Sequence, residues 1–371
     1  MDNIITYTEQ TMETFSQLPL SDVDSLILSC VAYLDIPQAL LPARSWKGLP
    51  LRELFRAEHF DRLFSVTFAP QRTRQLLTAL AASPRFRDVR VMGYVSALDP
   101  VGEKQFSAMT FRLGDRLSYI AFRGTDSTVT GWKEDFNMAF QSPVPSQQEA
   151  VRYLRQAAAH CPGILCLGGH SKGGNLAVYA AAFCDKRLQK RIRYVFSHDG
   201  PGFLRQVLDS PGFAAVSLRI RKTVPQSSVI GMLLEHQEQA KIVKSRTVSL
   251  LQHDPFTWEV KDNAFTVVDH LTSDARYVDR TLSAWLEQMS PDKRERFVDA
   301  LFGILETTDL QTFDQLRSDW QKTLPAVARQ VVHLDADTRD FLLRALKELA
   351  ALSLKAIPQT VRETVHGKKE S

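Results

Sequence analysis

The sequence has few of the features that would place the chain in a membrane or outside the cell. No apolar run approaches the roughly 18 residues of a spanning helix, and Met1–Ile4 opens neither a basic nor an apolar leader. Only four cysteines occur in 371 residues, none with the spacing of a metal site. Reduced thiols suit a reducing compartment. We therefore expect a cytoplasmic protein without a bound metal or cofactor.

The charge balance excludes a protein that binds nucleic acid through a basic surface. The net charge is only +4, and apart from one run the basic residues are not clustered. The one dense basic run, Lys186–Arg193, lies between a predicted helix and a predicted strand, where we expect a solvated helix end. The alternative is a patch for an anionic partner, which would allow peripheral contact with a membrane. The sequence does not indicate an oligomeric state.

The stretch that points most directly to function is Leu167–Asn175, which reads LGGHSKGGN. It fits Gly-x-Ser-x-Gly around Ser171, between a short apolar run, Gly163–Leu167, and an Ala-rich segment, Asn175–Phe183. Strand, sharp turn and helix in that order form a nucleophile elbow, which lifts the serine oxygen clear of the backbone. The glycines on either side of Ser171 leave room for such a turn. The alternative is a glycine-rich turn with an incidental serine.

Periodicity divides the chain into three parts. Residues 1–88 predict an N-terminal segment of short helices, broken by prolines, that packs on the core. Residues 89–272 alternate strands with helices, which is typical of an α/β protein with a mainly parallel sheet, here of the α/β-hydrolase fold. Residues 273–371 show helical periodicity alone, so we expect a C-terminal helical appendage.

Local patterns give individual elements. Apolar residues at helical spacing predict a helix over 22–34, capped by Ser21 or Asp22, and a second helix over 71–82. Apolar or β-rich composition between turn signals predicts strands over 89–98, 105–113, 117–122, 163–167, 194–197, 217–224 and 240–244.

A serine hydroxyl becomes a good nucleophile when a base accepts its proton, and that base is normally a histidine held by a carboxylate. In α/β-hydrolases the chain order is serine, acid, histidine. Ser171, Asp199 and His253 follow that order. Asp199 comes directly after the strand that follows the elbow helix, and His253 comes after the last predicted strand. Both are therefore expected among the loops at the carboxyl edge of the sheet.

Other residues compete for these roles. His236 is the alternative base, and Asp254 is the alternative acid. His170 is adjacent to the nucleophile and points elsewhere, so we expect it to shape the pocket. The non-catalytic interpretation makes Asp199 a turn residue and His253 an exposed loop histidine.

Acyl transfer also needs hydrogen-bond donors for the oxyanion that forms on the substrate. The backbone N–H of Lys172, at the start of the elbow helix, is one expected donor. The second should come from the loop after an earlier strand, where Thr125 can offer its N–H and its hydroxyl. The alternative for this loop is a β-turn with Arg123 in a nearby salt bridge.

Several of these segments resemble two lipase-like families. Ile120–Asp126, with Trp132 and Asp135 beyond it, is similar to the strand and oxyanion loop of class 3 lipases, and the Gly-His-Ser-x-Gly-Gly elbow is similar to theirs. A bacterial family of uncharacterised lipase-like α/β-hydrolases resembles the chain more closely, over about residues 20–265. The segments that carry this closer resemblance are Asp199–Phe203, Val224–Ser228 and Gln252–Pro255.

The chain departs from class 3 lipases at one position. Those enzymes usually carry the catalytic aspartate just before a Val-Pro pair, where this sequence has Lys222 and Thr223. The resemblance therefore supports Ser171 and Thr125 more strongly than Asp199.

Together the motifs predict a serine hydrolase that cleaves a carboxylic ester, with a small ester or a lipid as substrate. One alternative is a non-catalytic protein of the same fold that binds a ligand or partner in the same pocket. Another is a thioesterase or peptidase with the same triad.

Overall fold

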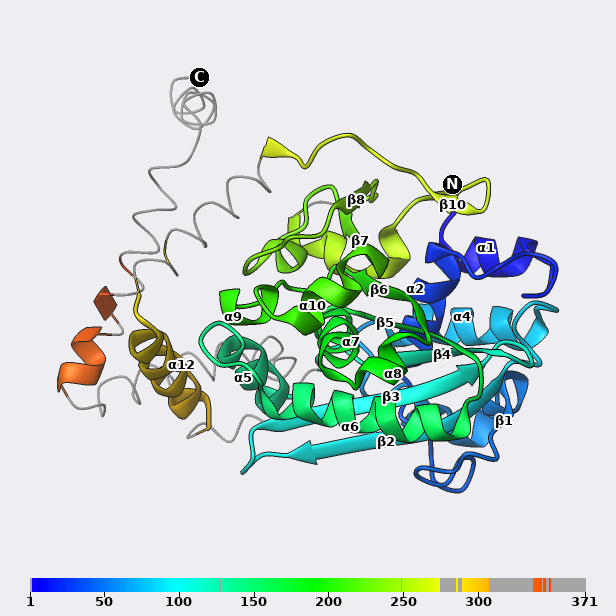
Figure 1. The fold of residues 1–371 in the computed structure, drawn as a ribbon, viewed down its shortest axis with the longest axis horizontal. Helices are drawn as coiled ribbons and strands as arrows, with labels where there is room; N and C mark the ends of the chain where they lie inside the picture. The colour runs from blue at the N-terminus through cyan, green and yellow to red at the C-terminus, as the bar shows by residue number, and fades with distance from the viewer. Residues whose placement is uncertain are drawn as a thin grey trace, which may run out of the picture. The chain divides into compact units, whose positions relative to one another are not determined.

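The computed structural model describes residues 2–126, 128–247, 249–273, 285, 289–306, 336–341, 343–344 and 347. The chain forms two compact units, Met1–Leu271 and Thr272–Ser371. The first unit contains the sheet and is drawn with labelled elements in Figure 1.

The first unit is built on an eight-stranded sheet whose strands lie in sequence order. Its first four strands pair antiparallel, and the strands from β4 to β8 pair parallel. The strands are β1 (Leu49–Pro50), β2 (Arg90–Asp99), β3 (Lys104–Arg112), β4 (Leu117–Phe122), β5 (Ile164–His170), β6 (Ile192–His198), β7 (Ile220–Pro225) and β8 (Ala240–Val243). A separate hairpin pairs β9 (Val260–Lys261) with β10 (Ala264–Phe265).

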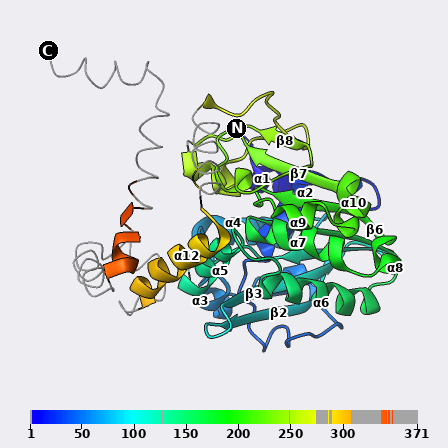
Figure 2. The ribbon, with the colours of Figure 1, turned by 60° about the vertical axis from the view of Figure 1, so that its left-hand side comes forward.

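Helices cover both faces of the sheet, and the topology explains which helices take which face. The parallel strands advance in one direction, so right-handed crossovers put all their helices on the same side. Those helices include α6 (Pro145–His160), α7 (Lys172–Phe183) and α10 (Pro211–Val216), which pack with one set of sheet side chains. Figures 1 and 2 show α6 and α7 running beside the strands.

The other face of the sheet is left for segments outside the crossovers, and the N-terminal helices bury it. Residues of α1 (Ile4–Gln10), α2 (Asp22–Val31) and α4 (Pro70–Ala82) form a second apolar cluster with the opposite side chains of the strands. Tyr119 and Ala121 belong to this cluster, whereas Ile120 and Phe122 belong to the first. This alternation within β4 is what a strand buried on both faces requires.

The predicted α/β class, with a mainly parallel sheet between helices, is confirmed. The predicted helix at 22–34 is α2, and Ser21 is its N-cap in a capping box with Asp24. The strand predicted over 217–224 begins later, because Ser217–Arg219 form a 3₁₀ turn. The sequence did not predict β1, because two residues carry no periodicity.

The remaining helices are short or lie between strands: α3 (Phe60–Leu63), α5 (Val129–Asn137), α8 (Lys186–Gln189) and α9 (Arg205–Leu208). In the second unit, α12 (Pro291–Glu306) begins at a proline, a residue that is favoured at the first position of a helix. The division at residues 88 and 272 stays a prediction, since most of the 273–371 segment lies outside the described residues. None of the helices described is both long enough and apolar enough to cross a bilayer.

Candidate active site

Ser171 occupies a strained turn between β5 and α7. Its φ of 59° and ψ of −135° are unusual for a residue other than glycine. Tight packing around the turn explains why its flanks are glycine: a Cβ on Gly169 would lie 2.2 Å from the Gly173 carbonyl carbon, and one on Gly173 would lie 2.1 Å from a carbonyl oxygen of β4. The strand, turn and helix have the geometry predicted for a nucleophile elbow, with Ser171 only 8% exposed.

Asp199 and His253 lie together although 54 residues separate them. Asp199 comes directly after β6, the parallel neighbour of β5, and is fully buried. His253 ends a 3₁₀ turn after β8 and keeps 28% of its side chain exposed. The His253 Nδ1–H donates to Asp199 Oδ2 over 2.7 Å. That contact leaves Nε2 as the nitrogen that can accept a proton.

The other carboxylate oxygen of Asp199 is held by a different segment. Asp199 Oδ1 accepts a hydrogen bond from the Ser228 hydroxyl and another, over 3.1 Å, from the Gly231 N–H. A Cβ on Gly231 would lie 2.2 Å from Asp199 Oδ1, so only glycine allows this approach. The two oxygens therefore have separate partners, and the carboxylate is fixed in one orientation.

His170 holds the loop that carries His253. Its Nε2–H donates to the His253 carbonyl over 2.8 Å, and its Nδ1 accepts from the Tyr33 hydroxyl over 3.2 Å. The two imidazole rings lie 4.5 Å apart between centroids. Complete burial, together with the neighbouring His253, lowers the pKa of His170 well below its usual value, which keeps the ring neutral. His170 therefore braces the loop of His253, and its expected role in shaping the pocket stays a prediction.

The rival residues have other partners. His236 Nδ1 lies 2.6 Å from Lys222 Nζ and 3.6 Å from the Glu238 carboxylate. Asp254 pairs with Arg72 at 2.5 Å and caps the Phe256 N–H. Lys222 stands where class 3 lipases carry their acid, and it contacts His236. Neither His236 nor Asp254 joins the contact between Asp199 and His253.

The loop after β4 packs directly against the elbow. A Cβ on Gly124 would lie 2.6 Å from the His170 carbonyl oxygen and 3.1 Å from Ser171 Cβ, so the backbone of this loop reaches Ser171. Arg123 forms the expected salt bridge, with Asp126 at 3.1 Å. The loop therefore contains the salt bridge of the alternative interpretation and also lies beside Ser171, and its oxyanion role stays a prediction.

The structure narrows what Thr125 can offer to an oxyanion. Its hydroxyl donates to Asp135 Oδ2, which differs from the expectation that both hydroxyl and N–H are available. Within the described part of the chain, no hydrogen bond takes the backbone N–H of Thr125 or that of Lys172. These two N–H groups are thus the remaining candidates for oxyanion donors.

Sequence reasoning missed the residues that support this arrangement. Ser228 lies in a segment that the family resemblance did include, yet nothing local indicates that its hydroxyl reaches Asp199. Asp135 was part of the resemblance without an assigned role. Tyr33 lies on the N-terminal segment, far from the elbow in sequence, and carries no signal for its contact with His170.

Comparison with known families identifies the chain. A family model described as Mbeg1-like matches residues 80–303, which is more than half of the chain. The chain belongs to the Mbeg1-like family. In this Mbeg1-like chain the match includes Ser171, Asp199 and His253. The resemblance drawn from the sequence is confirmed at the level of the family. No curated protein matches the sequence.

Several solved structures are similar in part. A Rhizomucor miehei lipase in its propeptide complex has 21% identity and a TM-score of 0.32; the alignment covers 42% of this chain and only 57% of that one. A fungal lipase–inhibitor complex has 17% identity and a TM-score of 0.37, covering 66% and 79%. The Rhizopus microsporus var. chinensis lipase has 16% identity and a TM-score of 0.34, covering 61% and 92%.

Proposed function

We propose that this Mbeg1-like protein is a serine hydrolase that cleaves a carboxylic ester through an acyl-enzyme. Ser171 is the nucleophile, His253 is the general base and acid, and Asp199 orients His253 and stabilises its imidazolium. The backbone N–H groups of Lys172 and Thr125 are the oxyanion donors.

The reaction has two halves. Ser171 Oγ attacks the ester carbonyl carbon while His253 Nε2 accepts the hydroxyl proton, and the carbonyl oxygen becomes an oxyanion. Collapse of this intermediate breaks the bond to the alcohol oxygen, which leaves with the proton from Nε2. A water molecule then attacks the acyl carbon and gives its proton to Nε2. The acid departs, and Ser171 Oγ recovers the proton.

The observation that carries this proposal is the hydrogen bond between Asp199 and His253 beside the strained turn of Ser171. Asp199 is fully buried, and three donors from two separate segments converge on it. A surface turn residue would not need such support. In the described residues, no hydrogen bond joins Ser171 Oγ to His253, and such catalytic contacts often tighten only with substrate.

We further propose that the acyl group is apolar. Phe68 is 51% exposed and packs edge-on against Tyr33, with ring centroids 5.3 Å apart, while its ring lies 6.1 Å from that of His170. Leu251, two residues before His253, is 67% exposed. Exposed apolar side chains beside His170 and two residues before the proposed base favour contact with a hydrocarbon chain or a lipid surface.

Hydrolysis of matched substrates tests this proposal. Purified protein should release p-nitrophenol from acyl esters, faster for butyrate or octanoate than for acetate, and Ser171→Ala should abolish turnover while retaining its melting temperature. A thioester and a peptide amide with the same acyl group separate the alternative chemistries. Turnover that survives in Ser171→Ala would refute the assignment, and no turnover of any of the three substrate classes would favour a non-catalytic binding protein.

A further inference from the structure

A buried lysine side chain lies behind the proposed oxyanion donors. Lys172 follows the nucleophile directly, and its side chain has no exposed surface. Its ammonium donates to the Gln105 carbonyl oxygen over 3.2 Å and to Glu134 Oε2 over 3.1 Å. Asp135 Oδ1 lies 3.5 Å from the same ammonium. A lysine is rarely buried this completely unless its charge has partners, and here three acceptors surround it.

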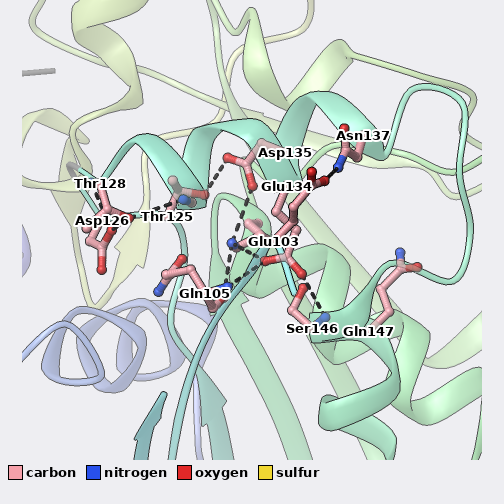
Figure 3. Close-up of polar contacts among 12 residues, drawn as sticks. Glu103, Gln105, Thr125, Asp126, Thr128, Glu134, Asp135, Asn137, Ser146 and Gln147 are labelled. Carbon is pink, nitrogen blue, oxygen red and sulfur yellow. Dashed lines mark hydrogen bonds and ion pairs between the residues drawn. The ribbon is translucent and has the colours of Figure 1, made fainter. Parts of the chain in front are cut away.

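These partners belong to α5 and to the strand beside it. Glu134 is fully buried and also accepts from the Gln105 N–H over 3.0 Å and from the Ser146 N–H over 2.7 Å. It therefore joins β3 to the start of α6. Asp135 Oδ2 accepts from the Thr125 hydroxyl, as Figure 3 shows. The two adjacent carboxylates of α5 thus have separate tasks, and both are within reach of one ammonium.

Resting on the proposed function, we propose that the Lys172 side chain is a positioning residue that ties the elbow helix to α5 and, through Asp135, holds Thr125 beside Ser171. The backbone N–H of Lys172 and that of Thr125 come from two different loops, and their spacing has to match one oxyanion. The ammonium lies 3.5 Å from Asp135, which accepts from the Thr125 hydroxyl, so it links the two sides of this gap through one carboxylate.

The electrostatics give the arrangement a dependence on pH. Burial raises the pKa of Asp135 to about 6, while the Lys172 ammonium and the Thr125 hydroxyl act to lower it. The carboxyl of Asp135 can therefore gain a proton just below neutral pH, and it then holds both the Lys172 ammonium and the Thr125 hydroxyl less strongly. The charged or titratable groups that act on Asp135 from its own and neighbouring elements are Lys172, Glu134 and Tyr33, while Arg123 and Asp126 pair with each other in the loop that carries Thr125.

Lys172→Met tests this role, because it keeps the backbone N–H and the length of the side chain and removes the charge together with its hydrogen-bond donors. We expect kcat for a p-nitrophenyl ester to fall about 100-fold, comparable to losing one oxyanion donor, with KM changed by less than about threefold. Since Asp135 then lacks the ammonium that lowers its pKa, the acid limb of the kcat profile should move to higher pH. In an Asp135→Asn background, the acid limb should no longer move, and adding Lys172→Met should lower kcat by less than about threefold further.

A matched control is Arg85→Met, which breaks another fully buried ion pair, with Asp24 at 2.6 Å, away from the elbow. It should lower the melting temperature and leave both kcat and the acid limb unchanged. An equal loss of kcat in Arg85→Met would mean that any buried ion pair has this effect, and it would overturn the inference. If Lys172→Met does not fold, Lys172→Gln replaces it, because glutamine keeps hydrogen-bond donors for Glu134 without a charge. The acid limb of its kcat profile should move to higher pH in the same way.

The outcomes separate the two proposals. A wild-type protein that cleaves no ester and reacts with no fluorophosphonate would overturn the proposed function and this inference with it. An active wild type whose Lys172→Met or Lys172→Gln variant keeps kcat within about threefold and an unmoved acid limb would overturn the inference alone.

Discussion

Replacing Asp199 by asparagine should inactivate the enzyme by changing the tautomer of His253. The Ser228 hydroxyl and the Gly231 N–H both donate to Asp199 Oδ1, so an asparagine at this position must keep its oxygen there. Its amide NH₂ then faces His253 Nδ1, which has to accept a hydrogen bond instead of donating one. The proton of the neutral ring moves to Nε2, and Nε2 can no longer accept the proton of Ser171.

The expected loss in kcat is up to about 10⁴-fold near neutral pH, or roughly 5 kcal/mol of transition-state stabilisation. The assay is steady-state hydrolysis of a p-nitrophenyl ester, with melting temperature as the measure of folding. Asp254→Asn is the matched control, because Asp254 is adjacent to His253 in sequence and bonds Arg72 instead; we expect less than a tenfold change. Activity of Asp199→Asn within tenfold of wild type, or a larger loss in Asp254→Asn, would refute the reasoning.

Three further predictions concern the base, the elbow and the stability. His253→Asn should lower kcat by about 10³-fold or more while His236→Asn stays within tenfold, and the reverse ranking would mean that the wrong base was chosen. Gly173→Ala should lower the free energy of unfolding by about 1–3 kcal/mol, because its Cβ would lie 2.1 Å from a backbone oxygen. Gly114→Ala should leave stability unchanged, because nothing lies within 4 Å of its Cβ. Equal melting temperatures for the two variants would contradict this prediction. Burial lowers the pKa of His198 to about 4, so the unfolded chain binds one more proton than the folded chain between about pH 6.5 and 4. The free energy of unfolding should therefore fall by about 3 kcal/mol as the pH falls through that window. In urea unfolding, His198→Asn should lack this dependence on pH of about 3 kcal/mol, and a variant with the same pH slope as the wild type would contradict the prediction.

Local patterns predicted the elements that have strong periodicity and the chain order of the candidate site. The elbow could be anticipated because its glycines and its flanking strand and helix are adjacent in sequence. The contact between Asp199 and His253 could be anticipated because parallel strands bring their carboxyl ends to one edge. Both predictions used rules that depend on sequence order alone.

What could not be predicted depends on tertiary contacts. Lys172 was considered only for its backbone N–H, because a lysine at the first position of a helix normally extends into solvent. Its burial depends on Glu134, which lies 38 residues earlier in the chain. The Thr125 hydroxyl was assigned to the oxyanion, because its acceptor on α5 has no signature in the sequence. Helix α5 itself, which begins at Val129 with Thr128 as its cap, has no prediction among the elements given by local patterns.

The most direct test of the central claim is the reaction of the purified protein with a fluorophosphonate probe, followed by mass spectrometry of the labelled peptide. The probe reacts with a serine only when a base activates it, and it requires no knowledge of the natural ester. The account predicts one adduct, on Ser171, that is absent from Ser171→Ala and formed at least 100-fold more slowly in His253→Asn. An unlabelled wild-type protein, or an adduct on another serine, would contradict it.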